Sequence, residues 1–476
     1  MQTSTFIRPA PLIDRLAAIV GDRYVLTDPA DVEPYLIEQR DLWHGKALCV
    51  VRPASTAEVS AVLKLCHETS TPVVPQGGNT GLVGGQVPDA SGTQVILSLN
   101  RMDKVREIDT ASNTMTVEAG LQLIRVQEAA DSADRLFPLS LASEGSCTIG
   151  GNLSTNAGGT AVITYGTARD LVTGLEVVLA DGRVMSTLSK LKKDNTGYDL
   201  KHLFMGAEGT LGIITAAVVK LFPKPRSRET AFVGLADPHK ATAFLTLAQE
   251  MAGSDVKTFE LMPRIGIEFM LKHCAATREP MGTAHRWYVL VELATQLETG
   301  LSETMLALLE RAAENGLIED AVVAASIEQR RYFWRVRELL AEAPKYEGGS
   351  IKHDICVPVS KVAVFLDEAF EVCERMIPGS RLVPFGHLGD GNIHTNLSQP
   401  VGADKDEFYA RWVEVNAAVH AIVAKYQGSI SAEHGIGVLK RDLLPAVKDP
   451  VAMEVMRALK KTLDPKGLLN PGKVLA

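Results

Sequence analysis

The sequence of 476 residues lacks several features that mark special classes of protein. Its six cysteines are scattered and form no CxxC pair, which argues against a disulfide framework or a cysteine-based zinc site. No apolar run approaches the roughly 20 residues of a transmembrane segment. The first eight residues, MQTSTFIR, hold no apolar core of a signal peptide. We therefore expect a cytoplasmic protein whose thiols are reduced.

Positive charge is also scarce. The chain has 49 lysines and arginines against 57 aspartates and glutamates, for a formal net charge of -8. An acidic chain without a basic stripe is a poor nucleic-acid binder, so we expect no nucleic-acid partner. What is present is typical of a globular protein, with 46% hydrophobic and 22% charged residues. The length predicts roughly two to three domains.

A Pro-Lys-Pro segment at residues 223–225 separates two regions whose patterns of expected helices and strands differ. It gives the clearest domain boundary in the sequence. Before it, we expect a helix over 56–67 and a hairpin over 177–185 that turns at Asp181-Gly182. After it, strand-like runs alternate with helices, which indicates one sheet with covering helices. The expected strands are 231–235, 287–293 and 322–325, and the expected helices are 238–251, 300–315 and 326–343.

A glycine-rich loop follows a short strand at residues 72–75. The loop consists of Pro75, Gln76, Gly77, Gly78, Asn79, Thr80 and Gly81. Glycine lets backbone amides approach a phosphate closely and permits positive φ. The spacing fits neither GxGxxG nor the P-loop. Taken alone, this segment is either a ligand-binding loop or a tight surface turn.

A second glycine-rich stretch lies between Pro138 and residue 167. It contains SEGSCTIGGN at 143–152, NAGG at 156–159 and YG at 165–166. Two long loops of this kind predict a large ligand that is threaded through the fold. For Gly158 and Gly159, the alternative to ligand contact is a structural role in close packing of the backbone.

The order of these motifs, followed by GAEGTLGIIT at 206–215, resembles the FAD domain of the vanillyl-alcohol oxidase and p-cresol methylhydroxylase (PCMH) type. The resemblance covers about residues 45–225. It implies that residues 76–80 cradle the FAD pyrophosphate. The further implied FAD contacts are Pro75, Gly81, Pro138, Gly145, Thr148, Gly151, Asn152 and the backbone of Ile214. Some relatives attach FAD through a loop histidine, but none lies between His67 and His202, so we expect non-covalent FAD.

Two histidine motifs stand near the C-terminus. PFGHLGDGNIHTN places His387 and His394 on either side of a glycine-rich turn, and SAEHGIG contains Glu433. Strands flanking the turn could point both imidazoles at one ion, with Glu433 as a third ligand. The pattern alone leaves open whether the histidines bind metal or are structural. It also leaves Asp390 open as a competing ligand or a cap of the turn.

These motifs and the ending LDPKGLLNPGK at 463–473 resemble the C-terminal domain of FAD-linked oxidases, above all the D-2-hydroxyglutarate and D-lactate dehydrogenases. The resemblance implies that His387, His394 and Glu433 bind zinc or a similar divalent metal. It implies that His434 is the catalytic base. The alternative is that His434 is itself a metal ligand and Glu433 only supports it. If His434 has neither role, His353 is the next candidate base.

The same resemblance implies a site for the substrate. Arg337 matches the arginine that grips the substrate carboxylate, Lys352 matches its partner lysine, and Asn396 matches a substrate-contacting asparagine. One position departs from the pattern: Ala341 stands where the 2-hydroxyglutarate enzymes carry a threonine, one helical turn after the arginine. One hydrogen bond to the substrate carboxylate is therefore expected to be missing.

The predicted fold is α+β. A two-part FAD-binding PCMH-type domain covers 1–225, an α+β substrate (cap) domain with the metal motif covers 226–430, and a helical C-terminal segment, 431–476, returns to the FAD domain. The resemblance implies an FAD-dependent dehydrogenase that oxidises a D-2-hydroxy acid. The expected substrate is (R)-2-hydroxyglutarate, and the expected reaction is hydride transfer to flavin N5 with metal-assisted deprotonation of the hydroxyl group.

Other activities and partners are compatible with the same residues. The alternatives are a D-lactate or glycolate dehydrogenase, a non-catalytic flavoprotein subunit of an oxidase complex, and a non-redox lipid-building synthase of the flavin family. The expected partners are a small anionic 2-hydroxy acid and a downstream electron acceptor, either an electron-transfer flavoprotein or a quinone. A homodimer is compatible with these expectations.

Overall fold

A computed structural model describes residues 9–476, with side chains from Leu12 onward. Residues 1–8, on which the expectation about a signal peptide rests, lie outside the described residues. The chain divides into two compact units, which are described separately. The first contains the described residues up to Ala157, Thr167–Pro223 and Glu433–Ala476, and the second contains Gly158–Gly166 and Lys224–Ala432. Helices and strands are mixed in both, which confirms the α+β class.

The first unit has a small sheet that carries the first glycine-rich loop. Its four strands run in the order β1–β2–β4–β3, and both β2 and β3 are parallel to β4. The strands are β1 (Val25–Leu26), β2 (Cys49–Val51), β3 (Val73–Gln76) and β4 (Val95–Ser98), and helices α1 (Pro9–Val20), α2 (Pro29–Val32) and α3 (Thr56–Thr69) belong to the same part of the chain. Continuous apolar runs such as Val95–Leu97 are buried, as expected for parallel strands.

A second sheet of the first unit has five antiparallel strands in the order β5–β6–β10–β8–β9. These are β5 (Val105–Asp109), β6 (Thr114–Glu118), β8 (Val172–Val178), β9 (Val184–Thr187) and β10 (Ile213–Lys220), accompanied by helices α4 (Leu123–Ser132) and α5 (Ile149–Thr155). The expected hairpin is confirmed, because β8 and β9 pair across a turn in which Gly182 has a φ of +87°. A separate short pair joins β7 (Arg135–Leu136) to β11 (Phe222–Pro223).

The second unit is built on an eight-stranded sheet whose named pairs are all antiparallel. The path runs β15–β12–β14–β13–β18–β19–β16, and β17 also pairs with β19. The strands are β12 (Ser227–Leu235), β13 (Val256–Pro263), β14 (Trp287–Thr295), β15 (Asp320–Val323), β16 (Ser350–Ile351), β17 (Ile355–Cys356), β18 (Arg381–His387) and β19 (Asn392–Ser398). Strand β13, which lies between β14 and β18, was not among the strands expected from the sequence.

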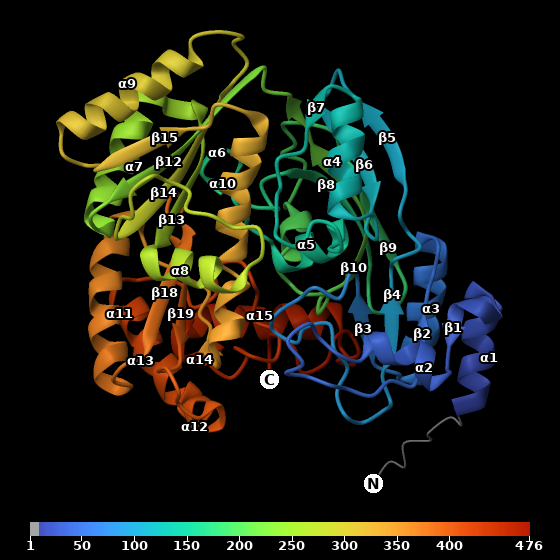
Figure 1. The fold of residues 1–476 in the computed structure, drawn as a ribbon. Helices are drawn as coiled ribbons and strands as arrows, with labels where there is room; N and C mark the ends of the chain where they lie inside the picture. The colour runs from blue at the N-terminus through green and yellow to red at the C-terminus, as the bar shows by residue number, and fades with distance from the viewer. Residues whose placement is uncertain (1–8) are drawn as a thin grey trace. The chain divides into compact units, whose positions relative to one another are not determined.

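Helices cover both faces of this sheet (Figure 1). Alternation along a strand assigns the faces, since Val289 and Val291 of β14 enter one core whereas Tyr288 and Leu290 enter the other. Helices α7 (Pro238–Ala252), α9 (Leu301–Glu314), α11 (Val362–Met376) and α13 (Trp412–Lys425) pack in the first core, and α8 (Arg264–His273) and α10 (Ile327–Leu339) pack in the second. The face with α8 and α10 is the one that carries the predicted site.

Two segments belong to a different unit from their neighbours in the sequence. Residues 158–166, which include α6 (Val162–Tyr165), group with the second unit, where the Thr164 hydroxyl donates to the Val256 carbonyl at 2.6 Å. Residues 433–476 group with the first unit, where the Asn470 amide donates to the Val73 carbonyl at 2.8 Å. The remaining helices are α12 (Lys405–Ala410), α14 (Leu444–Val447) and α15 (Pro450–Leu463). Among the described residues no helix is long and apolar enough to cross a membrane.

Candidate active site

The first glycine-rich loop is fastened to the protein by polar side chains. The Gln76 side-chain amide donates to the carbonyls of Tyr35 and Gln86 at 3.0 and 3.1 Å. The Asn79 amide donates to the Ile37 carbonyl at 2.8 Å, and its backbone has a φ of +54°. These bonds orient Asn79 so that its buried Oδ1 has no hydrogen-bond partner within the protein.

The two glycine-rich loops of the first unit lie in direct contact. A Cβ on Gly78 would lie 1.9 Å from the Ser146 carbonyl oxygen, and a Cβ on Gly77 would lie 2.3 Å from Thr148 Oγ1. Only glycine fits at position 78, where the clash is with backbone, whereas a larger residue at position 77 would displace the Thr148 side chain. Thr148 Oγ1 is buried and, like Asn79 Oδ1, lacks a hydrogen-bond partner within the protein. Buried polar atoms normally form hydrogen bonds. The Asn79 oxygen, as an acceptor, and the Thr148 hydroxyl, as a donor or acceptor, could therefore bind a polar ligand such as FAD.

The other residues predicted to contact FAD lie in the same unit. Pro138, Thr148 and Asn152 are buried, whereas Gly145 has no atom within 4 Å of an added Cβ. Ile214 lies on β10 opposite Val177 of β8, next to an irregularity between Ile214 and Ala216. Bulges of this kind re-aim the backbone and are frequent beside active sites.

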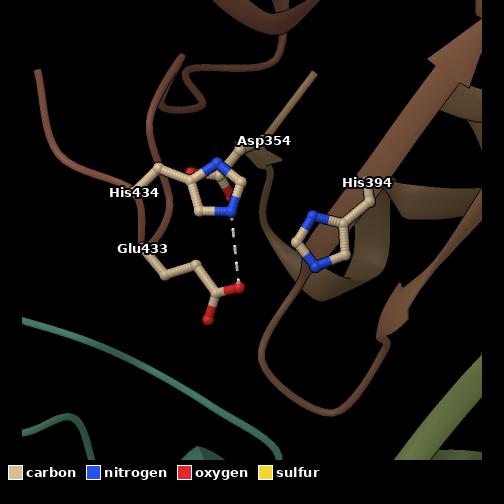
Figure 2. Close-up of side chains that lie close together, drawn as sticks. All are labelled: Asp354, His394, Glu433 and His434. Atoms are coloured by element: carbon tan, nitrogen blue, oxygen red, sulfur yellow. Dashed lines mark ion pairs between the residues drawn. The ribbon is translucent and has the colours of Figure 1, made fainter. Parts of the chain in front are cut away.

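Four potential metal ligands lie close together where the chain leaves the second unit. Ligand atoms of Asp354, His394, Glu433 and His434 all lie within 4.8 Å of one another. Figure 2 shows the four side chains, with the dashed line marking His434 Nε2 and Glu433 Oε1 at 3.9 Å. Glu433 directly follows Ala432, whose amide donates to the Asp354 carbonyl at 3.3 Å. Two imidazoles and two carboxylates form a donor set that suits zinc or a similar divalent metal.

His387 is close to this group but is not among its four members. Its ring lies 5.9 Å from that of His394, centroid to centroid, in a T-shaped arrangement. Alternation on β18 and β19 places His387, His394 and Asn396 on the sheet face that also carries α10. The assignment of His387 as a ligand therefore stays a prediction.

A buried carboxylate joins His387 to Arg337. Glu260 of β13 stands directly opposite His387 of β18 in the sheet. Its Oε1 lies 2.7 Å from His387 Nδ1, and its Oε2 accepts a hydrogen bond from Arg337 Nε at 2.7 Å. Glu260 is 0% exposed. Removing one partner of such a buried ion pair typically costs about 3–5 kcal/mol of stability, so this arrangement holds its members firmly.

The charge state of Glu260 follows from its surroundings. Burial by itself raises the pKa of a carboxyl group, but His387 and Arg337 outweigh it and lower the pKa of Glu260 to about 2. An ionised carboxylate only accepts hydrogen bonds, so His387 Nδ1 must be the donor. In the neutral ring, Nε2 then carries the lone pair that a metal requires.

The remaining predicted substrate residues occupy the same unit. Arg337 is buried on α10, with its guanidinium carbon 4.9 Å from the centroid of the Phe385 ring. Lys352 is half-buried between β16 and β17, one residue before the buried His353. Ala341 lies just beyond the end of α10, where its amide donates to the Glu338 carbonyl at 3.1 Å.

Two side chains near the histidine motif have structural hydrogen bonds. Asp390 Oδ1 accepts from the Asn392 amide at 2.9 Å, beside Gly391 with a φ of +84°, which confirms that Asp390 caps the turn. His353 Nδ1 donates to the Thr395 carbonyl at 2.7 Å, so this imidazole is held against β19.

The segment after Glu433 and His434 bends sharply. Gly435 and Gly437 have φ values of +86° and +50°, a region that favours glycine. Adjacent side chains of an extended strand point to opposite sides. The chain is also bent, not extended, at residues 432–434, which accounts for the presence of both Glu433 and His434 in one group of ligand atoms.

Glu260 and Asp354 belong to this region but were not predicted from the sequence. Asp354 was visible only as a neighbour of Lys352, and it is 2% exposed with Oδ1 accepting from the Asn392 side chain at 3.1 Å. Glu260 stands in an apolar segment with no motif around it. Its 127-residue separation from His387 explains why no local pattern revealed it.

Comparisons with known families and curated proteins cover both units. The family described as "FAD binding domain" matches residues 47–188. The family described as "FAD linked oxidases, C-terminal domain" matches residues 224–474. The chain is 38% identical over 457 residues to the mitochondrial D-2-hydroxyglutarate dehydrogenase of Arabidopsis thaliana, covering 96% of this chain and 80% of the relative. It is 35% identical over 465 residues to D-2-hydroxyglutarate dehydrogenase of Stutzerimonas stutzeri, covering 98% and 99%.

Solved structures with the same fold have far lower sequence identity. A p-cresol methylhydroxylase with bound substrate superimposes with a TM-score of 0.76 at 18% identity, covering 98% of this chain and 96% of the other. An alkyldihydroxyacetonephosphate synthase superimposes with a TM-score of 0.73 at 18% identity, covering 99% and 86%. At this identity the two structures show the fold alone.

Proposed function

Because this chain belongs to the family of FAD-linked oxidases that includes the D-2-hydroxyglutarate dehydrogenases, we propose that it oxidises a D-2-hydroxy acid to the 2-oxo acid. The proposed substrate is (R)-2-hydroxyglutarate, which yields 2-oxoglutarate. The observation that carries the proposal is the group of two imidazoles and two carboxylates at Asp354, His394, Glu433 and His434. It occurs in a chain that also carries the FAD-binding loops.

Residues already described would hold FAD and the metal. When bound, FAD would accept the hydride from C2, which carries both electrons of the oxidation, and a divalent metal would polarise the substrate oxygen as a Lewis acid. The loop residues 75–81 with Thr148 and Asn152 would hold FAD. The proposed metal ligands are His387, His394 and Glu433, and Asp354 is a further candidate because its carboxylate lies in the same group.

The chain's own residues would bind and orient the acid. Arg337 uses Nε to contact Glu260, so its Nη1 and Nη2 groups are the donors proposed to pair with the substrate carboxylate. Lys352 would add a second positive charge, and Asn396 would donate or accept at a substrate oxygen. Such clamps decide which face of C2 meets the flavin, which is the physical basis of a preference for one enantiomer.

The proton of the substrate hydroxyl needs a base. His434 is proposed to accept it at Nε2, the nitrogen that faces Glu433. An imidazole suits this role near neutral pH, because its ordinary pKa allows both charge states. The alternative, in which His434 is a metal ligand, remains, since its ring nitrogen belongs to the same group of ligand atoms.

Anaerobic mixing with D- and L-2-hydroxy acids tests the proposal. D-2-hydroxyglutarate is expected to bleach the flavin absorbance fastest, with D-lactate and D-malate slower and the L acids inactive. Equal rates on both enantiomers, or bleaching by glycolate alone, would contradict the proposal. No bleaching by any acid would favour a non-catalytic flavoprotein subunit or a non-redox synthase.

Other parts of the proposal concern the flavin and the partners. Acid precipitation should release all FAD into the supernatant, because neither glycine-rich loop contains a histidine; flavin left in the pellet would contradict non-covalent binding. The electron acceptor, either an electron-transfer flavoprotein or a quinone, stays a prediction, as do the homodimer and the cytoplasmic location.

A further inference from the structure

The two carboxylate oxygens of Glu260 contact residues with two different predicted functions, metal binding and substrate binding. Oε1 faces Nδ1 of the predicted metal ligand His387, and Oε2 faces Nε of the predicted substrate-binding Arg337, each at 2.7 Å. All three side chains are buried. Bulk water cannot replace either hydrogen bond at such depth, so Glu260 contributes directly to the orientation of both partners.

We propose that Glu260 is a positioning residue that couples the metal site to recognition of the substrate carboxylate. The inference rests on the proposed function, because it takes His387 as a metal ligand and Arg337 as the carboxylate clamp. Through Oε1, Glu260 sets the tautomer and the ring orientation of His387. Through Oε2, it holds the guanidinium plane of Arg337 so that Nη1 and Nη2 point at one place.

The chemistry of a carboxylate is essential to this double role. Glutamine has one acceptor oxygen and one donor amide group. If its oxygen faces Arg337, the amide donates to His387 Nδ1 and the ring proton moves to Nε2, which then cannot ligate a metal. If its oxygen faces His387, the amide confronts the Nε–H of Arg337 and the guanidinium must turn away. Glu260→Gln therefore damages at least one of the two sites.

A second buried glutamate provides a matched control. Glu292 of the neighbouring strand β14 is 2% exposed, compared with 0% for Glu260. Its Oε2 accepts from the Thr230 hydroxyl at 2.9 Å and from Trp334 Nε1 at 3.2 Å. Its remaining polar contact is an ion pair with Arg228, so Glu292→Gln removes a comparable buried charge without changing the bonds from Glu260 to His387 and Arg337.

The experiment measures Co²⁺ affinity without any acid present, and then KM and kcat for the D-2-hydroxy acid. Glu260→Gln is expected to weaken Co²⁺ binding by about 10–100-fold, the range typical of lost outer-shell partners of a metal ligand. The KM is expected to rise about tenfold. Excess metal should restore kcat but leave KM high, because Arg337 is still misplaced. Glu292→Gln should match the wild-type protein in both Co²⁺ affinity and KM.

If Glu260→Gln fails to fold, Glu260→Asp replaces it. Aspartate keeps the charge but is one methylene shorter, so it cannot hold both partners, and smaller losses in the same direction are expected. Co²⁺ affinity and KM equal to those of Glu292→Gln, in a wild-type background that binds Co²⁺ and oxidises a D acid, would overturn the coupling alone. A wild-type protein that binds no Co²⁺ would overturn the proposed metal site and this inference with it.

Discussion

The carboxylate of Glu208 accepts a hydrogen bond from the backbone amide of Gly437 at 2.9 Å. Its other oxygen accepts from the Ile436 amide at 2.7 Å. Glu208 belongs to the GAEGTLGIIT motif and has a φ of +50°, an uncommon value for a residue other than glycine. Burial raises the pKa of this carboxyl, and the two amides oppose that shift. One side chain of the predicted flavin motif thus fastens the bend that follows His434.

Glu208→Gln should loosen this bend, because the NH2 group that replaces one carboxylate oxygen cannot accept a hydrogen bond from the backbone amide that it faces. We expect kcat to fall about tenfold, a loss of roughly 1.4 kcal/mol in transition-state stabilisation. Hydrogen exchange in a peptide covering residues 433–439 should be faster while FAD is retained. Glu118→Gln, at a buried glutamate paired with Arg106 at 3.2 Å, is the matched control. Unchanged hydrogen exchange in the Glu208 variant would show that the bend is stable without the hydrogen bonds from Glu208.

The metal site can be mapped by removing one ligand at a time. His394→Ala and His387→Ala are both expected to abolish bound metal, and Asp354→Asn should weaken metal binding by tenfold or more, because its carboxylate lies in the group of ligand atoms. Metal content after gel filtration is the measurement. Asp390→Asn is the control, since asparagine can still accept from the Asn392 amide and cap the turn. Full occupancy in His387→Ala would restrict the site to the four grouped side chains.

His434→Ala separates a base from a ligand. If His434 is the base, the variant keeps metal and FAD and loses turnover by about 10²–10⁴-fold. If it is a ligand, the same substitution empties the metal site. Metal analysis and flavin reduction rates on one preparation decide between the two. Near wild-type turnover with metal retained would reject both roles and direct attention to His353.

Lys473 should make stability depend on pH in the alkaline range. Burial lowers its pKa from 10.5 to about 8, although Asp89 and Glu208 attract the charge. Between these pH values the unfolded chain binds more protons than the folded protein, so stability rises with pH, by about 3 kcal/mol at most. Lys473→Met should lack this rise in denaturant titrations from pH 8 to 10.5. Lys466→Met, at an exposed lysine of the same segment, should keep it; equal slopes in both variants would refute the assignment.

Local patterns in the sequence were sufficient for several parts of this protein. Periodicity predicted α3, α7 and α9 to within a few residues, because each buries one apolar stripe. The turn at Asp181-Gly182 was predicted from glycine's access to positive φ. The motif order also led to the FAD-linked oxidase family, since a glycine that touches backbone, such as Gly78, cannot be replaced without a clash.

Other features depend on contacts between distant parts of the chain. Strand β13 is buried on both faces and has no period-two pattern, so only its pairing with β14 and β18 identifies it. Residues 158–166 were predicted with the first domain, yet they belong to the second unit through contacts such as that of Thr164 with Val256. A local pattern carries no information about such partners.

The sequence by itself determined the family, the fold class and the glycine-rich and histidine motifs, because those depend on backbone conformation and on residue types that stand close together in the chain. Only the tertiary structure decided that Glu260 stands between His387 and Arg337, and that Asp354 joins His394 in the group of ligand atoms. The reason is physical: antiparallel pairing brings Glu260 opposite a residue 127 positions away, and burial makes that carboxylate the shared acceptor of both.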